Sequence, residues 1–144
     1  MKVFLDANIF FAAAKSSNGG SALILKLAKN KKIKIVTVNY ALLEAERNIK
    51  NKLSQRFLFL HYQNILDANP EIQSLDFVTI KDIASFQNIL TLKDIPILLG
   101  ALLSGAEALI TLDKKDFLNN QKLRDLNLPF KISNPENFFK NIFN

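Results

Sequence analysis

This chain of 144 residues has no cysteine and a single histidine. Without cysteine it can form no disulfide, no thiolate zinc site and no cysteine nucleophile, which fits a reducing cytoplasm. The lone His61 lies between Leu60 and Tyr62 in a stretch rich in phenylalanine and leucine. We expect it to be a packed side chain, so a Ser-His-Asp triad has little to work with.

Long apolar runs are also missing. The longest, Ile95 to Leu103, has the length of a core helix and falls short of the roughly 20 residues that a bilayer span requires. The charge of Asp6 follows too soon after Met1 for a signal peptide. We therefore expect a cytoplasmic protein that does not contact membranes.

Acidic residues are scarce in the first part of the chain. Residues 1–61 hold 11 Lys and Arg against three acids, whereas residues 62–144 hold eight against ten. A basic half favours a phosphate backbone as partner, although a solvated surface explains the same bias. The residues that we predict to bind nucleic acid, or alternatively to form a solvated turn, are Lys29, Lys31, Lys32 and Lys34.

Predicted strands alternate with predicted helices along the whole chain. We expect strands over residues 2–5, 33–38, 77–80, 108–111 and 130–132. The expected helix N-caps are Ser21, Asn39, Asp82 and Asp94. For the last helix, Ser133 and Glu136 have capping-box spacing, and Pro135 suits the first helical position after Asn134. This alternation predicts one α/β domain over residues 1–144, a three-layer sandwich with a mainly parallel sheet of four to five strands flanked by helices.

Four acidic residues have similar positions in this pattern. Asp6 ends the apolar run that begins at Val3, and Asp113 follows the strand at 108–111. Glu44 and Asp94 each lie near the start of a predicted helix. In parallel sheets, ligands bind beyond the carboxyl ends of the strands, so the four carboxylates are expected to meet there.

Crowded carboxylates repel one another unless a cation neutralises them. Hard cations such as Mg²⁺ and Mn²⁺ prefer carboxylate and water oxygens. A metal held in this way polarises a phosphoryl oxygen and lowers the pKa of bound water. The sequence therefore predicts hydrolysis of a phosphodiester bond by metal-activated water.

Simpler roles exist for the same acids. Asp6 and Asp94 are natural N-caps, and capping is compatible with metal binding. On a helical wheel Glu46 falls nearer the expected apolar arc than Glu44 does, so either glutamate could face the site. Asp113 and Asp116 are three residues apart, and each could be solvated or capping.

Four stretches of the chain resemble PIN-domain ribonucleases in order, spacing and strand context. They are residues 3–10, 42–49, 94–98 and 106–117. The resemblance runs from end to end and implies an Mg²⁺- or Mn²⁺-dependent nuclease acting mainly on RNA. Many similar members are VapC toxins, which are held inactive by a cognate antitoxin and are commonly homodimers.

The resemblance also implies roles for individual residues. Asp6 would be a direct metal ligand, and Glu44 and Asp94 would complete the ligand set or orient its waters. Asp113 would be the fourth acid. The remaining matches are Asp116 as an additional acid that binds metal, and Asn8 and Thr111 as supporting polar residues.

Two other classes of function compete with the nuclease. A haloacid-dehalogenase-like phosphatase also begins with an aspartate after its first strand, but it needs a second aspartate two residues later, where this chain has Asn8. The second alternative is a PIN-like module that binds RNA or a protein partner without catalysis. The presence of all four acids argues against a decayed site.

Overall fold

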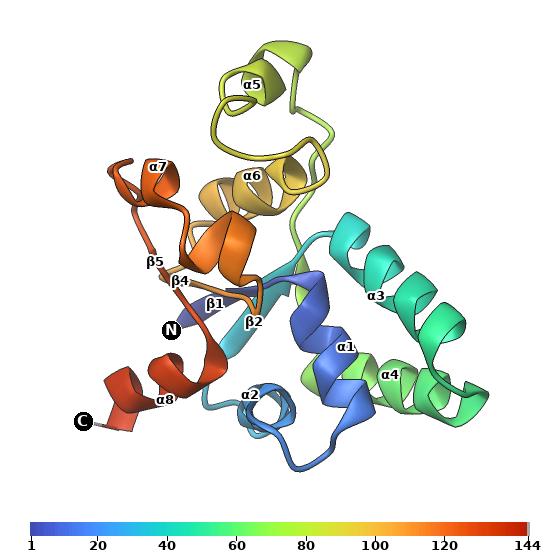
Figure 1. Cartoon of the computed structure of the whole chain (residues 1–144). Helices are drawn as coiled ribbons and strands as arrows, with labels where there is room; N and C mark the ends of the chain where they lie inside the picture. Colours follow the sequence, from blue (N-terminus) through green and yellow to red (C-terminus); the bar gives the residue numbers. More distant parts are fainter. Residues whose placement is uncertain (144) are drawn as a thin grey trace.

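A computed structural model describes residues 1–143, and its centre is a five-stranded parallel sheet. The strand order is β3-β2-β1-β4-β5, so the first strand lies in the middle (Figure 1). The strands are β1 (Lys2–Leu5), β2 (Lys34–Thr37), β3 (Glu71–Ile72), β4 (Ala108–Ile110) and β5 (Lys131–Ser133). The predicted three-layer α/β sandwich is confirmed.

Helices cover both faces of the sheet. In Figure 1, α1, α2 and α8 lie below the sheet and α6 lies above it, while α3 and α4 pack beside α1. The helices before the short edge strand β3 are α1 (Ala7–Lys15), α2 (Gly20–Lys29), α3 (Asn39–Lys52) and α4 (Gln55–Ala68). Those after it are α5 (Ile80–Ala84), α6 (Ile95–Ser104), a single π-helical turn η1 (Lys114–Leu118), α7 (Gln121–Arg124) and α8 (Pro135–Phe143).

Strand register decides which residues meet at the carboxyl edge of the sheet. Leu5 is the register partner of Ile110, so the residues that follow them, Asp6 and Thr111, emerge side by side. The Asp6 amide donates to the Ile110 carbonyl at 3.1 Å, which extends the ladder by one bond. Parallel pairing of β1 and β4 thereby joins two segments that are more than a hundred residues apart.

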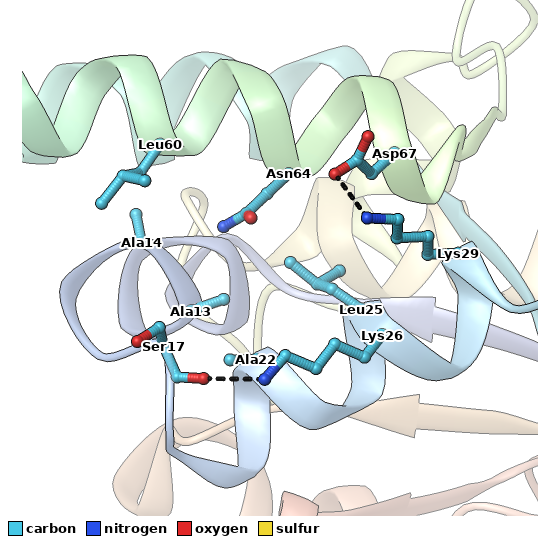
Figure 2. A pocket seen from close by; sticks show the side chains of 10 residues that line it. All are labelled: Ala13, Ala14, Ser17, Ala22, Leu25, Lys26, Lys29, Leu60, Asn64 and Asp67. Atoms are coloured by element: carbon cyan, nitrogen blue, oxygen red, sulfur yellow. Dashed lines mark hydrogen bonds and ion pairs between the residues drawn. The ribbon is translucent and has the colours of Figure 1, made fainter.

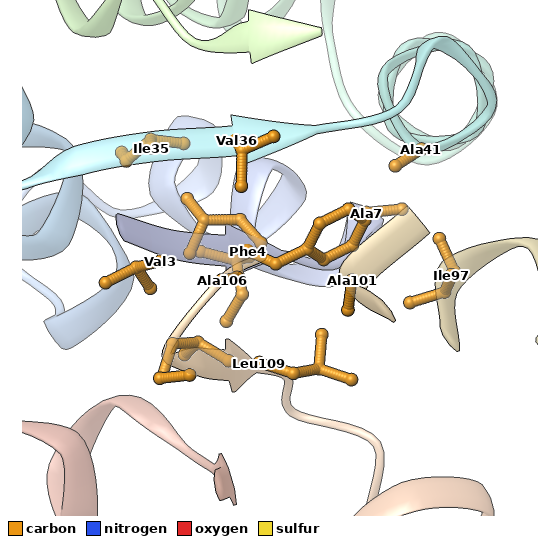
Figure 3. Packing of buried hydrophobic residues seen from close by; sticks show 14 of the residues in the cluster. Val3, Phe4, Ala7, Ile35, Val36, Ala41, Ile97, Ala101, Ala106 and Leu109 are labelled. Atoms are coloured by element: carbon orange, nitrogen blue, oxygen red, sulfur yellow. The ribbon is translucent and has the colours of Figure 1, made fainter. Parts of the chain in front are cut away.

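The centre of the core is packed tightly enough to require glycine at one position of α6. Phe4, Val36 and Leu109 from three strands are fully buried (Figure 3). A Cβ atom at Gly100 would lie 2.6 Å from Val38 Cγ1 and 2.9 Å from Phe4 Cε2. Gly100 thus allows α6 to approach the sheet closely.

One predicted strand is wrong. The third strand is the two-residue β3, Glu71–Ile72, whereas residues 77–80 lead into α5. Phe77 and Ile80 are apolar and typical of strands, but their side chains are 88% and 86% exposed. The apolar pattern of 77–80 therefore does not reflect burial in the sheet.

Two predicted N-caps are also wrong. Gly19 precedes α2, and Ser21 lies inside that helix. Val38 precedes α3, so Asn39 is already the first helical residue. Both helices begin one or two residues early, because the extended backbone of Gly19 and of Val38 allows the turn without a side-chain cap.

Two further helix starts differ from prediction in the residue that caps them. Thr79 caps α5 through a capping box in which Asp82 is the third helical residue rather than the cap. Asn134 accepts a hydrogen bond from the Asn137 amide at 2.8 Å, while Ser133 belongs to β5. Pairing with β4 keeps Ser133 extended and shifts the cap by one position.

The lengths of the helices bear on the expectation that the chain has no membrane-spanning segment. None of the helices within residues 1–143 is both long enough and apolar enough to span a bilayer.

Candidate functional site

Asp6 is a buried carboxylate held by three hydrogen bonds. Its backbone is extended at the end of β1, and its Oδ1 accepts from the Ala7 amide at 2.6 Å. Its Oδ2 accepts from the Thr111 hydroxyl at 2.8 Å and from the Asn8 amide at 3.3 Å. Only 5% of the residue is exposed. Asp6 is therefore both the cap of α1 and a charge fixed in one orientation.

Burial raises the pKa of Asp6 from 3.8 to about 6. Hydrogen bonds from Thr111 and Ala7 lower it, and the negative charges of Glu44 and Asp94 raise it again. Loss of hydration thus outweighs the donors, as expected for a carboxylate packed among other acids. A bound cation would reverse this balance by favouring the ionised form.

Asn8 and Thr111 connect the two strand ends. The Asn8 Oδ1 accepts from the Leu112 amide at 3.0 Å, and its Nδ2 donates to the Thr111 hydroxyl at 3.2 Å. That hydroxyl also accepts from the Asp113 amide at 3.1 Å. The network fixes the segment that carries Asp113 relative to Asp6.

A second group of acids lies beside the first. Asp94, Asp113 and Asp116 each offer a carboxylate oxygen, and these oxygens all lie within 4.8 Å of one another. Asp94 begins α6 but makes no side-chain capping bond; its Oδ2 instead accepts from the Thr91 hydroxyl at 2.7 Å. Asp113 Oδ1 accepts from the Asp116 amide at 2.9 Å and so caps η1.

The pKa of Asp94 is also raised to about 6, mainly by burial. The Thr91 hydroxyl lowers it, while the carboxyl groups of Asp116 and Asp113 raise it. Two carboxylates in one hollow thus resist ionisation in the metal-free protein. A pKa raised both by burial and by neighbouring carboxyl groups is typical of functional sites.

Glu44, and not Glu46, lines the cavity that holds Asp6. Glu46 accepts a hydrogen bond from the Tyr62 hydroxyl and pairs with Lys50 at 3.1 Å. The buried stripe of α3 is Ala41, Ala45 and Ile49. The helical wheel favoured Glu46 because its apolar arc included the half-buried Leu42 and Leu53 and left out the buried Ala41. The observed stripe is centred about as far from Glu44 as from Glu46, so the wheel does not decide between them.

The cavity that these acids share has a volume of about 230 Å³. It is polar and lies between the ends of β1 and β4 and the helices α1, α3 and α6. Its lining residues are Asp6, Ala7, Asn8, Phe11, Glu44, Asn48, Lys52, Lys93, Asp94 and Asp113. Phe11, Asn48, Lys52 and Lys93 were not predicted, although a four-residue step along α3 from Glu44 leads to two of them.

Other hollows carry different chemistry. A cavity of about 140 Å³ between α1, α2 and α4 contains an ion pair between Lys29 and Asp67 (Figure 2). Leu25 and Leu60 supply much of its apolar lining. It holds one carboxylate, already paired, so it lacks the charge density of the acidic cavity.

The predicted lysine cluster lies at the opposite edge of the sheet. Lys34 is the first residue of β2, so it marks the amino end of the strand, whereas the acids follow carboxyl ends. Lys29 pairs with Asp67 at 3.4 Å and Lys34 pairs with Glu71 at 3.5 Å. Lys31 and Lys32 are exposed, and all four lysines line a second cavity of about 410 Å³.

His61 is remote from the acids. It is 1% exposed on α4 and lies edge-on to Phe10, with ring centroids 6.3 Å apart. Its Nδ1 has no hydrogen-bond partner in the described part of the chain, and burial lowers its pKa.

Comparison with solved structures adds a direct test of the fold. The chain is similar to the crystal structure of VapBC2 from Rickettsia felis bound to a DNA fragment from their promoter. The TM-score is 0.63 at 18% identity, over 93% of this chain and 98% of that one. The chain has a VapC-like PIN fold.

Comparison of the sequence with known families and proteins gives no match. No protein-family model matches the chain, and no curated protein matches it either. The VapC-like arrangement is therefore carried by the backbone and the strand order, while most side chains differ.

Proposed function

We propose that this protein is a metal-dependent ribonuclease that cleaves RNA with water activated at the acidic cavity. The observation that carries the proposal is the meeting of Asp6, Glu44, Asp94 and Asp113 in one cavity, with Asp116 beside them. The VapC-like fold supports the same reading, as does the net charge of +6.

The donors fit a hard divalent cation. Asp6, Asp94, Asp113 and Asp116 would hold Mg²⁺ or Mn²⁺, since carboxylates are the ligands that these ions prefer. When bound, the ion polarises a phosphoryl oxygen and makes its water a better nucleophile. The raised pKa values of Asp6 and Asp94 fit a pocket in which the ionised carboxylates are costly until a cation neutralises them.

The chain's own residues prepare this chemistry. Thr111 and Asn8 occupy one oxygen of Asp6 and leave its position fixed. Thr91 does the same for Asp94. Because these donors are already paired with the carboxylates, little reorganisation is needed when the substrate arrives. Glu44 lines the cavity from α3, where it can accept a proton from a water or orient it.

The phosphatase alternative is weakened by the hydrogen bonds of Asn8. Its oxygen accepts from the Leu112 amide, and its nitrogen donates to Asp6 and Thr111. A residue in that position of a haloacid-dehalogenase-like enzyme must exchange a proton, which an amide so engaged does not do.

The proposal extends to protein partners. The similar Rickettsia felis structure is titled as a VapBC2 assembly on promoter DNA, which supports a cognate antitoxin and a toxin role here. We also propose a homodimer. Phe77, Ile80 and Leu92 are 88%, 86% and 64% exposed between β3 and α6, which is unusual unless another surface covers them.

The test is cleavage of RNA by purified protein with Mn²⁺, with Mg²⁺ and with EDTA. We expect products only with the metals, and none from Asp6→Asn. Hydrolysis of small phosphate esters without cleavage of RNA would contradict the proposal. RNA binding that EDTA does not change, with no products under any condition, would favour the non-catalytic module.

A further inference from the structure

The acidic cavity extends between α1 and α3, two helices that contact each other (Figure 1). We call the end of the cavity lined by Phe11, Asn48 and Lys52 the α1–α3 groove. Glu44, Asn48 and Lys52 are spaced by four residues, so they lie along one side of α3. Phe11 faces them from α1, and all four line the same cavity as Asp6. Eight residues of helix separate Glu44 from Lys52, or about 12 Å along the axis.

The chemistry of this groove changes along its length from acidic to amide to aromatic and cationic. The Lys52 ammonium lies 5.9 Å from the centroid of the Phe11 ring, at the limit of a cation–π contact. Phe11 is half-buried and Lys52 is exposed. Within residues 1–143, Lys52 makes no ion pair and the Asn48 amide makes no hydrogen bond.

An unpaired nucleotide offers a partner for each of these side chains: a phosphate for the lysine, a base face for the phenylalanine and a base edge for the amide. Proteins that bind single strands combine cations for the backbone with aromatic rings on which bases stack. An amide beside the ring can bond the edge of an unpaired base. Lys93 adds a second cation on the far side of the cavity, and the Tyr40 hydroxyl fixes its carbonyl at 2.9 Å.

We propose that the α1–α3 groove holds a single strand of RNA next to the cleaved bond. A base stacks on Phe11, its phosphate contacts Lys52, and Asn48 bonds the base edge. A base within a duplex is already stacked on both faces, so this site selects unpaired RNA. The inference rests on the proposed function, because it takes the acidic cavity as the place of cleavage.

The chain has no tryptophan, which gives the site a clean reporter. Phe11→Trp creates a single indole at the proposed stacking position, and Leu66→Trp creates one at an exposed position of α4, beside the residues that line the lysine cavity and outside the acidic one. In EDTA, where cleavage is absent, we expect a short single-stranded oligoadenylate to quench Phe11→Trp. A duplex of the same length should quench it much less, and Leu66→Trp should not respond to either.

Binding of labelled oligoadenylate to Phe11→Leu and Lys52→Gln provides a second measurement, by fluorescence anisotropy. We expect each change to weaken binding about tenfold, the low to middle range for loss of one stacked base. Phe11→Tyr should retain binding. Lys32→Gln, which removes a charge at the opposite edge of the sheet, is the matched control and should bind as wild type does.

Two results would overturn the inference. One is an indole at position 11 that single-stranded RNA does not quench more than it quenches the indole at 66. The other is a loss of binding in Lys32→Gln with none in Phe11→Leu or Lys52→Gln. If the wild-type protein still cleaves RNA, either result would contradict only this inference, and the proposed nuclease function would stand. Quenching at position 11 without cleavage under any metal would instead contradict the proposed function alone.

Discussion

Asp6 shows how a single residue can link fold and chemistry. The carboxylate caps α1, accepts a hydrogen bond from Thr111 across the β1–β4 pair, and is 5% exposed. Burying a charge is unfavourable unless it is paired, and no cation side chain bonds Asp6 in the described chain. Its position is therefore costly for stability and useful for binding a metal.

This cost predicts a pH dependence for the metal-free protein. The pKa of Asp6 is about 6 in the folded state and 3.8 ordinarily, so between these values the folded state binds more protons. The free energy of unfolding therefore falls as pH rises from about 4 to 7, by up to about 3 kcal/mol from this residue.

Urea unfolding in EDTA across this pH range measures the effect. Asp6→Asn should lose most of this contribution, while exposed Asp76→Asn should follow wild type. Mn²⁺ should restore stability at pH 7 in wild type and Asp76→Asn but not in Asp6→Asn, because an ion that binds the folded state stabilises it. Equal pH profiles for wild type and Asp6→Asn would refute the argument.

The two glutamates of α3 give a matched comparison. Glu44 lines the acidic cavity, whereas Glu46 bonds Tyr62 and Lys50 on the outer side of the helix. Glu44→Gln should lower the rate of RNA cleavage by roughly tenfold or more, in line with loss of a group that orients metal ligands. Glu46→Gln should leave the rate near that of wild type, and a reversed pattern would exclude our assignment.

At the scale of elements, α6 positions Asp94 and depends on its contact with the sheet. Gly100 lies in the middle of this helix, where alanine would ordinarily stabilise by about 1 kcal/mol. A Cβ there would meet Val38 and Phe4 at less than 3 Å. We predict that Gly100→Ala lowers the free energy of unfolding by about 1–3 kcal/mol, because overpacking outweighs helix propensity.

Thermal and urea unfolding test this prediction. Gly19→Ser is a suitable control: its Cβ would come no closer than 3.6 Å to other atoms, and serine is a favoured N-cap. An unchanged or raised stability of Gly100→Ala would show that α6 does not need the close approach.

The elements that sequence predicted well are those whose pattern and burial agree. β1, β4 and α6 are apolar runs that are buried, and Gly105 ends α6 with a φ of 70°. The prediction failed for β3 and for residues 77–80 because apolar character and burial do not agree in these two segments. The edge strand Glu71–Ile72 is exposed, while the apolar Phe77 and Ile80 are outside the core.

The same contrast holds within the site. The acids were predictable from their places after strands and at helix starts, and parallel pairing explains why they meet. The choice between Glu44 and Glu46 was not predictable, because it depends on which side of α3 faces α1. Phe11 and Lys52 were missed because a half-buried phenylalanine and a surface lysine carry no signal until two helices are side by side.

At the scale of the whole molecule, opposite edges of the sheet carry opposite charge. The acids lie at the carboxyl edge, and Lys2, Lys31, Lys32 and Lys34 lie at the amino edge. Lys2 and Lys34 are partly neutralised by Glu71. The cations that line the acidic cavity are instead Lys52 and Lys93, so total charge alone does not locate the substrate.

The proposed homodimer makes a prediction at this scale. If the apolar side chains between β3 and α6 are an interface, Phe77→Ser with Ile80→Ser should shift the protein from dimer to monomer. Neither residue contributes to the buried core, so the fold should persist. Leu66→Ser, at another exposed site on α4, is the control.

Analytical ultracentrifugation at micromolar concentration distinguishes these states. A dimer that survives both changes at 77 and 80 would place the interface elsewhere. A wild-type protein that sediments as a monomer at every concentration would remove the homodimer from the proposal.

The central claim is that acids from distant segments form one divalent-metal site. A crystal soaked in Mn²⁺, with anomalous diffraction, tests it most directly. We predict a manganese ion bound by Asp6 together with carboxylates from Asp94, Asp113 or Asp116, and its absence in Asp6→Asn. Anomalous density elsewhere on the protein, with none among these carboxylates, would contradict the account.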